Sequence, residues 1–291
     1  AHVRAALAGG GRRPARAAPE PLAPPALRRR RRTAPGHLDR PPRVVDFGSG
    51  SGNLILPLAH LNPNCTFIAV DYKTEAINIL LSRAAEANLN NIKGWVGRIE
   101  DFSEPFDVAI SLHACGSATD LAILQSIQNN APYIVSPCCI GKVKFAMINS
   151  EKDQVPKDKT TPDIICINKG NATSSSSSAL INTGALAVTY PRSKWLGSQV
   201  STEEYKLIAA AADWSPQWNS SPQPQHISGL SEHTQRHAEN KSLLQKACKM
   251  LVETDRSEFA KEYPKPFDSR VLEIPQLRMY PKSHIIVGTP T

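Results

Sequence analysis

The stretch VVDFGSGSGN, residues 44–53, joins a short apolar run to an acid and three alternating glycines. Glycine permits a positive φ and lets a ligand approach the backbone closely, so the stretch predicts a strand that ends in a ligand-binding turn. A dinucleotide-binding turn needs G-x-G-x-x-G, but Asn53 occupies the third glycine position and Gly52 comes one residue early. A phosphate loop needs Gly-Lys followed by Ser or Thr, which this stretch lacks. The pattern therefore favours neither of these two ligand classes.

Acidic residues follow the next two apolar runs of the chain. Asp71 comes 25 residues after Asp46, at the end of the second run, and Glu100 and Asp101 come just after the third. The carboxyl ends of parallel strands meet at one edge of a sheet, where ligands of open α/β sheets bind. We therefore expect these acids to lie on the same side of the sheet as the glycine turn.

With its leading acid the turn reads D-x-G-x-G-x-G, which resembles the first motif of class I S-adenosylmethionine-dependent methyltransferases. The resemblance implies that the turn passes beneath the methionine moiety of the cofactor, where a Cβ would collide. It also implies that Asp71 accepts hydrogen bonds from the ribose hydroxyls and that an acid after the third strand lies near the adenine amino group. The cofactor-binding residues that we expect on this basis are Asp46, Gly48, Gly50, Gly52, Asp71, Glu100, Asp101 and His113.

A second group of reactive side chains lies in SLHACGSATD, residues 111–120, and in SPCC, residues 136–139. Each stretch follows an apolar run, and in a sheet of order 3-2-1-4-5 these two strands are neighbours about 4.8 Å apart. Their carboxyl ends should reach the same rim as the cofactor. The residues expected to gather there are His113, Cys115, Asp120, Cys138 and Cys139.

Three interpretations of these cysteines are open. One cysteine would be a nucleophile, as in RNA cytosine-5 methyltransferases, where a thiolate adds to the pyrimidine ring. Alternatively, His113 and Cys115 with the adjacent pair Cys138 and Cys139 would hold zinc, although this is not a familiar ligand spacing. Free cysteines also pack as small apolar residues. We favour this last interpretation, in which His113, Cys138 and Cys139 shape the site of the methyl acceptor without a metal.

Four segments together resemble the methyltransferase domain of the glutathione S-transferase C-terminal domain-containing protein family: VVDFGSGSGN, LHACG-x-ATD, SPCC-x-GK and IIVGTP. The resemblance covers residues 43–139, recurs at 190–196 and 201–213, and ends within 240–290. Related RNA methyltransferases carry similar Leu-His-x-Cys-Gly and Cys-Cys elements. The resemblance therefore implies methyl transfer to RNA, either tRNA or rRNA. A protein or small-molecule acceptor, or a cofactor-binding scaffold without activity, are the alternatives.

Strand-like and helix-like segments alternate from residue 43 to residue 139, which is typical of a parallel sheet with helices on both faces. The predicted strands are 43–47, 66–70, 92–96, 106–112, 133–136, 271–280 and 285–288. The predicted helices are 54–60, 74–87, 118–128, 201–212, which a capping box opens, and 241–263. We expect an α/β fold with a seven-stranded, mostly parallel, Rossmann-like methyltransferase sheet of order 3-2-1-4-5-7-6. This domain would span 43–291, with flexible insertions at about 146–193 and 214–238.

The net charge of +8 at pH 7 belongs to the first 43 residues, which contain eleven Arg but only two acids. Such a segment, rich in Arg, Pro and Ala, cannot build a core, so residues 1–42 are expected to form a disordered tail. No apolar run reaches the roughly 18 residues of a membrane span. The six cysteines do not suggest a disulfide framework. We expect a cytoplasmic protein without a membrane partner, or an organellar one if the tail is a transit peptide.

Overall fold

The computed structural model describes residues 40–112, 114–140, 142–143, 163–166, 188–213, 232–275 and 283–291, with backbone alone at 163–166 and 232–239. Its strands are β1 (Arg43–Phe47), β2 (Thr66–Asp71), β3 (Ile92–Val96), β4 (Val108–Leu112), β5 (Tyr133–Ser136), β6 (Asp163–Cys166), β7 (Phe267–Glu273) and β8 (His284–Pro290). Its helices are α1 (Ile55–Leu61), α2 (Thr74–Glu86), α3 (Ser117–Gln128), α5 (Lys194–Gly197), α6 (Thr202–Ala212) and α7 (Glu232–Glu262), with a 3-10 turn η1 (Ile99–Asp101).

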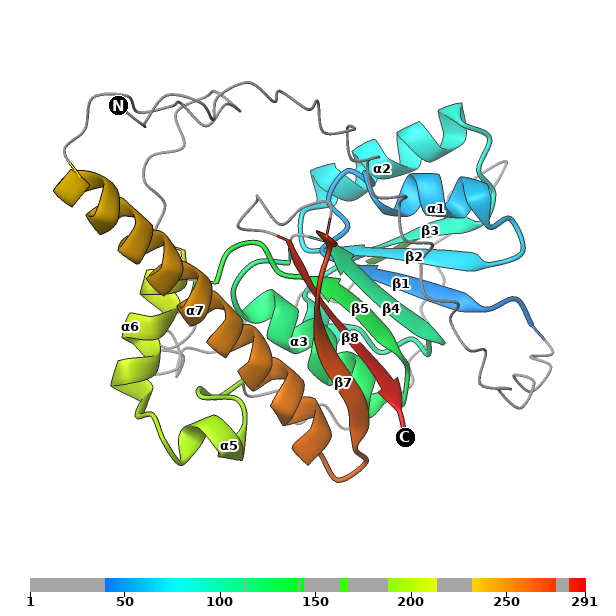
Figure 1. Cartoon of the computed structure of the whole chain (residues 1–291). Helices are drawn as coiled ribbons and strands as arrows, with labels where there is room; N and C mark the ends of the chain where they lie inside the picture. Colours follow the sequence, from blue (N-terminus) through cyan, green and yellow to red (C-terminus); the bar gives the residue numbers. More distant parts are fainter. Residues whose placement is uncertain are drawn as a thin grey trace, which may run out of the picture. The chain divides into compact units, whose positions relative to one another are not determined.

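The strands form one sheet of order β6-β3-β2-β1-β4-β5-β8-β7 (Figure 1). Strands β1 to β5 are parallel, β8 is antiparallel to β5, and β7 is antiparallel to β8. Apart from β6, the order is therefore the predicted 3-2-1-4-5-7-6. β6 adds an eighth strand, antiparallel to β3, at the sheet edge. The mostly parallel, Rossmann-like sheet is confirmed, with one strand more than predicted.

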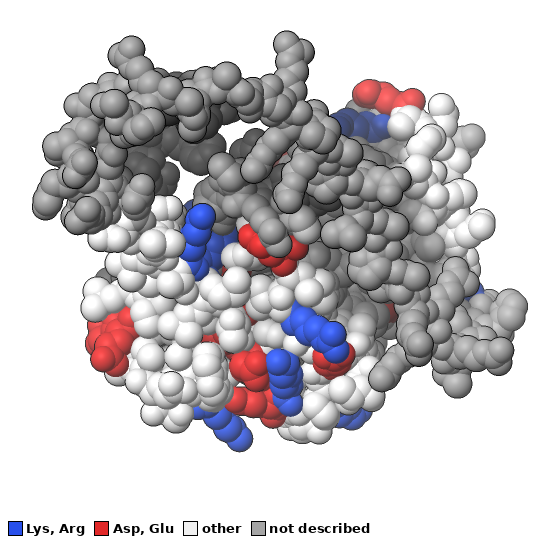
Figure 2. Space-filling view, viewed as in Figure 1, with Lys and Arg blue, Asp and Glu red and all other residues white. Residues whose placement is uncertain are grey.

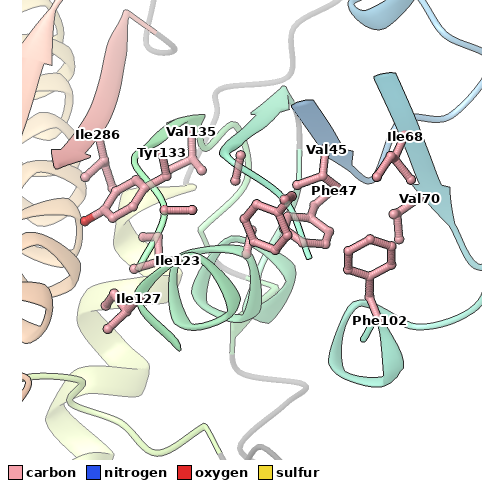
Figure 3. Close-up of a cluster of buried hydrophobic side chains, with 14 of the residues drawn as sticks. Val45, Phe47, Ile68, Val70, Phe102, Ile123, Ile127, Tyr133, Val135 and Ile286 are labelled. Carbon is pink, nitrogen blue, oxygen red and sulfur yellow. The ribbon is translucent and has the colours of Figure 1, made fainter. Parts of the chain in front are cut away.

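Successive side chains of a strand point to opposite sides of the sheet, and in the central strands the side chains on both sides are buried. On β2, Phe67 and Ala69 pack with α1 and α2, whereas Ile68 and Val70 pack in the cluster that contains α3 and the end of α7. Figure 3 shows this second cluster around α3. The carboxyl ends of β1 and β2 are therefore fixed by packing on two sides, as a precise site requires.

The folded part begins before the predicted boundary at residue 43. Arg40 donates from Nη1 and Nη2 to the two carboxylate oxygens of Asp107, at 2.7 and 3.0 Å, and the backbone N of Arg43 donates to the same carboxylate at 2.7 Å. Residues 40–42 therefore belong to the folded domain and not to the tail.

Most of the insertion predicted at 146–193 lies outside the described residues. Its described parts are β6 and residues 188–193, of which Tyr190, Arg192 and Ser193 are buried. Of the second predicted insertion, residues 214–231 lie outside the described part of the chain, and α7 already begins at Glu232.

Acidic and basic side chains are interspersed over the described part of the face in Figure 2. This agrees with the near-neutral charge of the sequence beyond residue 43. Among the described residues, no helix is both long and apolar enough to cross a membrane.

Candidate functional site

The glycine turn follows β1 and is held against β2. The backbone N atoms of Gly48 and Ser49 both donate to the carbonyl oxygen of Val70, at 2.9 and 3.1 Å. Gly48, Gly50 and Gly52 have φ angles of 76°, 53° and 90°, a region in which residues with a Cβ are strained. The strand, turn and helix predicted from residues 44–60 are therefore present.

The glycines of this turn differ in what a side chain would meet. A Cβ on Gly50 would have no protein atom within 4 Å, whereas one on Gly52 would lie 2.9 Å from side-chain atoms of Leu56 and Leu80. The space beside Gly50 is thus open to a ligand. Gly52, which we had assigned to the cofactor, also has a packing role, because its lack of a side chain lets α1 and α2 approach the turn.

Asp71 ties the glycine turn to the start of α2. Its Oδ2 accepts from the backbone N of Gly50 at 3.0 Å, and its Oδ1 accepts from the backbone N of Lys73 at 2.9 Å. A carboxylate has about four lone-pair sites, so each oxygen can accept a further bond. Asp71 therefore holds the turn and can still receive hydroxyl donors.

Asp46 is a buried acid beneath the turn. Its side chain is 1 % exposed, and neither carboxylate oxygen has a hydrogen-bond partner. Burial, together with the negative charge of Asp71, raises the pKa of Asp46 to about 7. Burying such a group without partners is costly, so a cationic ligand would stabilise it. The expected cofactor, S-adenosylmethionine, carries a sulfonium and an ammonium group, and therefore fits both this carboxylate and the open space at Gly50.

Glu100 and Asp101 lie in η1, directly after β3. Gln125 of α3 supports this turn by donating from Nε2 to the carbonyl oxygen of Ile99 at 3.0 Å. Glu100 pairs with Arg98 at 2.5 Å, whereas Asp101 is exposed. Asp101 is therefore the more accessible of the two acids. The sequence analysis missed Gln125, although an amide within an apolar helix pattern is a usable signal.

Three cysteines converge where β4 and β5 end. Leu112 and Ser136 are paired in the parallel register, so the residues just beyond them meet. The Sγ atoms of Cys115 and Cys138 are 2.9 Å apart, and those of Cys138 and Cys139 are 3.6 Å apart. The structure thus brings together the cysteines that the strand order predicts as neighbours.

Hydrogen bonding shifts the pKa values of Cys115 and Cys138 in opposite directions. The bond with Cys138 lowers the pKa of Cys115 to about 5; burial opposes this shift, and Cys139 and the positive charge of Lys142 add to it. The bond with Cys115 raises the pKa of Cys138. The thiolate is the nucleophilic form, so Cys115 is more readily activated as a nucleophile than Cys138. Our sequence prediction had named Cys138 and Cys139 for the acceptor site instead.

The other two residues expected at this rim have different outcomes. His113 lies outside the described residues. Asp120 does not face a ligand: it is buried, and accepts from Nε and Nη2 of Arg256, both at 2.9 Å, and from the hydroxyl of Tyr190 at 2.8 Å. Arg256 also donates to the carbonyl oxygen of Gly116 at 3.0 Å. Asp120 therefore anchors α7 and residues 188–193 to α3, which corrects its placement at the rim.

Residues 32–145 match the model of a family described as a methyltransferase domain. The glutathione S-transferase C-terminal domain-containing protein of Bos taurus is 26% identical over 248 residues, which cover 85% of this chain and 30% of that protein. Its Mus musculus counterpart is 36% identical over 117 residues, or 40% of this chain and 18% of that protein. Trans-aconitate 2-methyltransferase of Mycobacterium sp. (strain KMS) is 40% identical over 57 residues, which cover 20% of this chain and 22% of that enzyme.

The resemblance expected from the glycine turn and the cysteine segments is confirmed by these matches. The chain spans less than a third of the length of the bovine and murine relatives. What those longer proteins do as a whole is therefore not carried over to this chain.

Proposed function

We propose that the chain uses its methyltransferase domain to transfer a methyl group from S-adenosylmethionine to RNA. The observation that carries the proposal is the site at the carboxyl end of β1. There the space beside Gly50 is open, and the Asp46 carboxylate is buried without a hydrogen-bond partner. A cationic ligand that lies against the glycine backbone satisfies both conditions.

Each residue of this site has a distinct proposed role. Gly48 and Gly50 leave room for the methionine moiety, and the carboxylate of Asp46 balances its positive charge. Asp71 holds the turn and would accept from the ribose hydroxyls. Asp101, with Glu100 beside it, would hold the adenine end of the cofactor. Bound there, S-adenosylmethionine supplies a methyl group on a positively charged sulfur for in-line displacement by a nucleophilic atom of the acceptor.

The acceptor approaches the rim formed by the loops after β4 and β5. An in-line displacement gains mostly from the positioning of its two reactants, so the loops carrying His113, Cys138 and Cys139 need only orient the acceptor. RNA is favoured because related RNA methyltransferases resemble this chain in the Leu-His-x-Cys-Gly and Cys-Cys segments. The Arg-rich tail also suits phosphate contacts. We place this activity in the cytoplasm.

A small-molecule acceptor is the second candidate. It is favoured by the 57-residue match to an enzyme that is named for methylating trans-aconitate. The rim residues do not discriminate between the two acceptors, so the choice between them depends on the product.

Titration calorimetry tests the cofactor. The full chain should bind S-adenosylmethionine and its demethylated product, and should not bind NAD at comparable affinity. Gly50→Val should abolish this binding, because the side chain fills space that the protein leaves open and strains a backbone with φ 53°. Gly197→Val is the matched control, since a Cβ there also meets no atom within 4 Å but lies away from the turn in α5. NAD binding at equal strength, or unchanged affinity in Gly50→Val, would refute the cofactor assignment.

Product analysis tests the acceptor. RNA from cells lacking the protein, incubated with the purified chain and isotopically labelled S-adenosylmethionine, should gain a labelled nucleoside that mass spectrometry identifies. The Gly50→Val chain should add no label. Label found only in the small-molecule fraction would overturn the RNA assignment and support the second candidate.

A further inference from the structure

We propose that Cys115, Cys138 and Cys139 form a zinc site that joins the loop after β4 to the loop after β5. The zinc site shares Cys138 and Cys139 with the proposed acceptor rim, but its assignment does not depend on methyl transfer. It rests on where three sulfur atoms lie and on the backbone that places them there.

The sulfur geometry is close to that of a metal site. The three Sγ atoms all lie within 4.8 Å of one another, and no other His, Cys, Asp or Glu group of this kind occurs among the described residues. A tetrahedral ion with Zn–S bonds of about 2.3 Å holds its sulfur ligands about 3.8 Å apart. The Cys138–Cys139 separation of 3.6 Å already matches this value. The Cys115–Cys138 separation of 2.9 Å must open by about 0.9 Å, which side-chain rotation can supply.

The chemistry of the sulfur ligands limits which metal ions would bind. Three cysteine thiolates form a soft ligand set, which favours zinc, copper(I) or iron–sulfur clusters over hard cations. Zinc is also known with three protein ligands and one open position. Three thiolates around a divalent ion leave a net charge of −1. The positive charge of Lys142, which acts on Cys115, offsets it.

The backbone places the ligands before any ion binds. The register of Leu112 with Ser136 aligns the two strand ends, and the backbone N of Gly116 donates to the carbonyl oxygen of Cys139 at 2.9 Å. Gly116 has φ +63°, and a Cβ there would lie 3.1 Å from the carbonyl carbon of Lys142. Only glycine allows this approach of the two loops without strain.

This arrangement answers the objection that the spacing of the ligands along the chain is unfamiliar. Familiar zinc spacings separate the two ligands of one loop by about two to four residues. Here one ligand follows β4 and two follow β5, so the sheet register, and not the sequence interval, brings them together. The described residues fill three of four tetrahedral positions, and the fourth is left to water or a further ligand at the edge where the acceptor is expected.

Elemental analysis provides the first test. The full chain, purified without chelator, should contain about one zinc per chain. Cys115→Ser and Cys138→Ser should each reduce this content at least several-fold. Cys248→Ser should not, because Cys248 is an equally part-buried thiol that lies in α7 outside the cluster. Zinc content that is equal in all three variants would overturn the proposal.

A second test needs no variant and stays informative if the serine variants fail to fold. Replacing the metal of the wild-type chain with Co²⁺ should give a thiolate-to-cobalt charge-transfer absorption, and a strong chelator should lower the melting temperature. Thiol titration of the unfolded chain, without a reducing agent, shows whether the cysteines are free or oxidised, and two results would contradict the proposal. A metal-free chain with native stability and six titratable thiols has no zinc site, and a Cys115–Cys138 disulfide found by mass spectrometry also refutes it.

Discussion

Asp46 is the residue with the clearest conflict between stability and function. The pKa of this buried acid rises from 3.8 to about 7, because burial and the charge of Asp71 both disfavour the carboxylate. Between these values the folded chain keeps a proton that the unfolded chain has released. The free energy of unfolding therefore falls as the pH rises from about 4 to about 7, by up to roughly 4 kcal/mol. Binding of a cation next to Asp46 would offset the free-energy cost of burying its carboxylate.

Asp46→Asn should remove this pH dependence. The amide cannot ionise, so the variant should lose the fall in unfolding free energy between pH 4 and pH 7 and should be at least as stable as the wild type at pH 8. Its affinity for S-adenosylmethionine should fall tenfold or more. Wild-type affinity should rise between pH 6 and pH 8, as the carboxylate ionises. Urea unfolding and calorimetry at several pH values measure both effects.

Asp101→Asn serves as the control, because Asp101 is exposed and should leave the pH dependence of stability unchanged. If Asp46→Asn and the wild type show parallel stability curves, the buried carboxylate is not the titrating group.

At the scale of elements, the contact between Asp120 on α3 and Arg256 on α7 joins parts of the chain that are far apart in sequence. The two side chains are 0 % and 1 % exposed, and Arg192 approaches the same carboxylate at 3.6 Å. The bond from Arg256 to the carbonyl oxygen of Gly116 extends this contact to the cysteine loop. Helix α7 therefore supports the acceptor rim through this bond to the loop after β4.

Arg256→Met should reduce the free energy of unfolding by about 3–5 kcal/mol, because the buried charge of Asp120 loses its main cationic partner. Among the described residues, only Arg192, at 3.6 Å, and the hydroxyl of Tyr190 would still face this carboxylate. Adding Asp120→Leu to this variant should restore part of the loss, since both charges are then absent. Urea denaturation of the two single variants and the double variant measures the coupling. Strictly additive losses would show that the two side chains do not act as a pair.

The prediction of elements succeeded where local pattern and burial agree. Strands β1, β3 and β5 have their predicted bounds, and the capping box of Ser201 and Glu204 opens α6. The strand predicted at 271–280 in fact begins at Phe267 as β7. One of the buried residues at the start of β7 is the polar Ser269, whose hydroxyl hydrogen-bonds that of Tyr133 at 2.8 Å. The first residues of β7 therefore do not form an apolar run from which the strand could be predicted. Neither β6 nor the four-residue helix α5 was anticipated.

The candidate site was predictable to the same extent. The sequence predicts that Asp46, Asp71 and the cysteines lie at one edge of the sheet, because each follows a predicted strand and the carboxyl ends of parallel strands meet at the same edge. It could not find Arg256, whose partner Asp120 lies 136 residues earlier. It also placed Asp120 at the rim, because a sequence does not show which acids are neutralised by distant cations.

At the scale of the whole molecule, the tail and the domain should separate cleanly at Asp39. A chain that starts at Arg40 should keep the melting temperature and cofactor affinity of the full chain, because the composition of residues 1–39 offers no core. Differential scanning fluorimetry and calorimetry measure these quantities. If RNA is the acceptor, the shortened chain should bind RNA more weakly, most of all at low salt.

Arg40→Ala in this shortened chain is the companion variant. It should lower the melting temperature slightly, because it removes the pairing with Asp107. A large fall in melting temperature on removing residues 1–39 alone would show that the tail is part of the fold.

The long interval between Asp120 and Arg256 also sets the order in which the molecule can be completed during synthesis. Ser269, the hydrogen-bond partner of Tyr133, is likewise synthesised 136 residues after it, and β5 has no antiparallel neighbour until β8 is made. At about 5–20 residues per second, the ribosome needs roughly 7–27 seconds to cover that distance. Throughout this time the nascent chain carries a complete glycine turn beside a sheet with an open edge, a state that invites pairing with other strands. The half of the protein that binds the cofactor is therefore expected to require chaperone protection until its last helix and strand emerge.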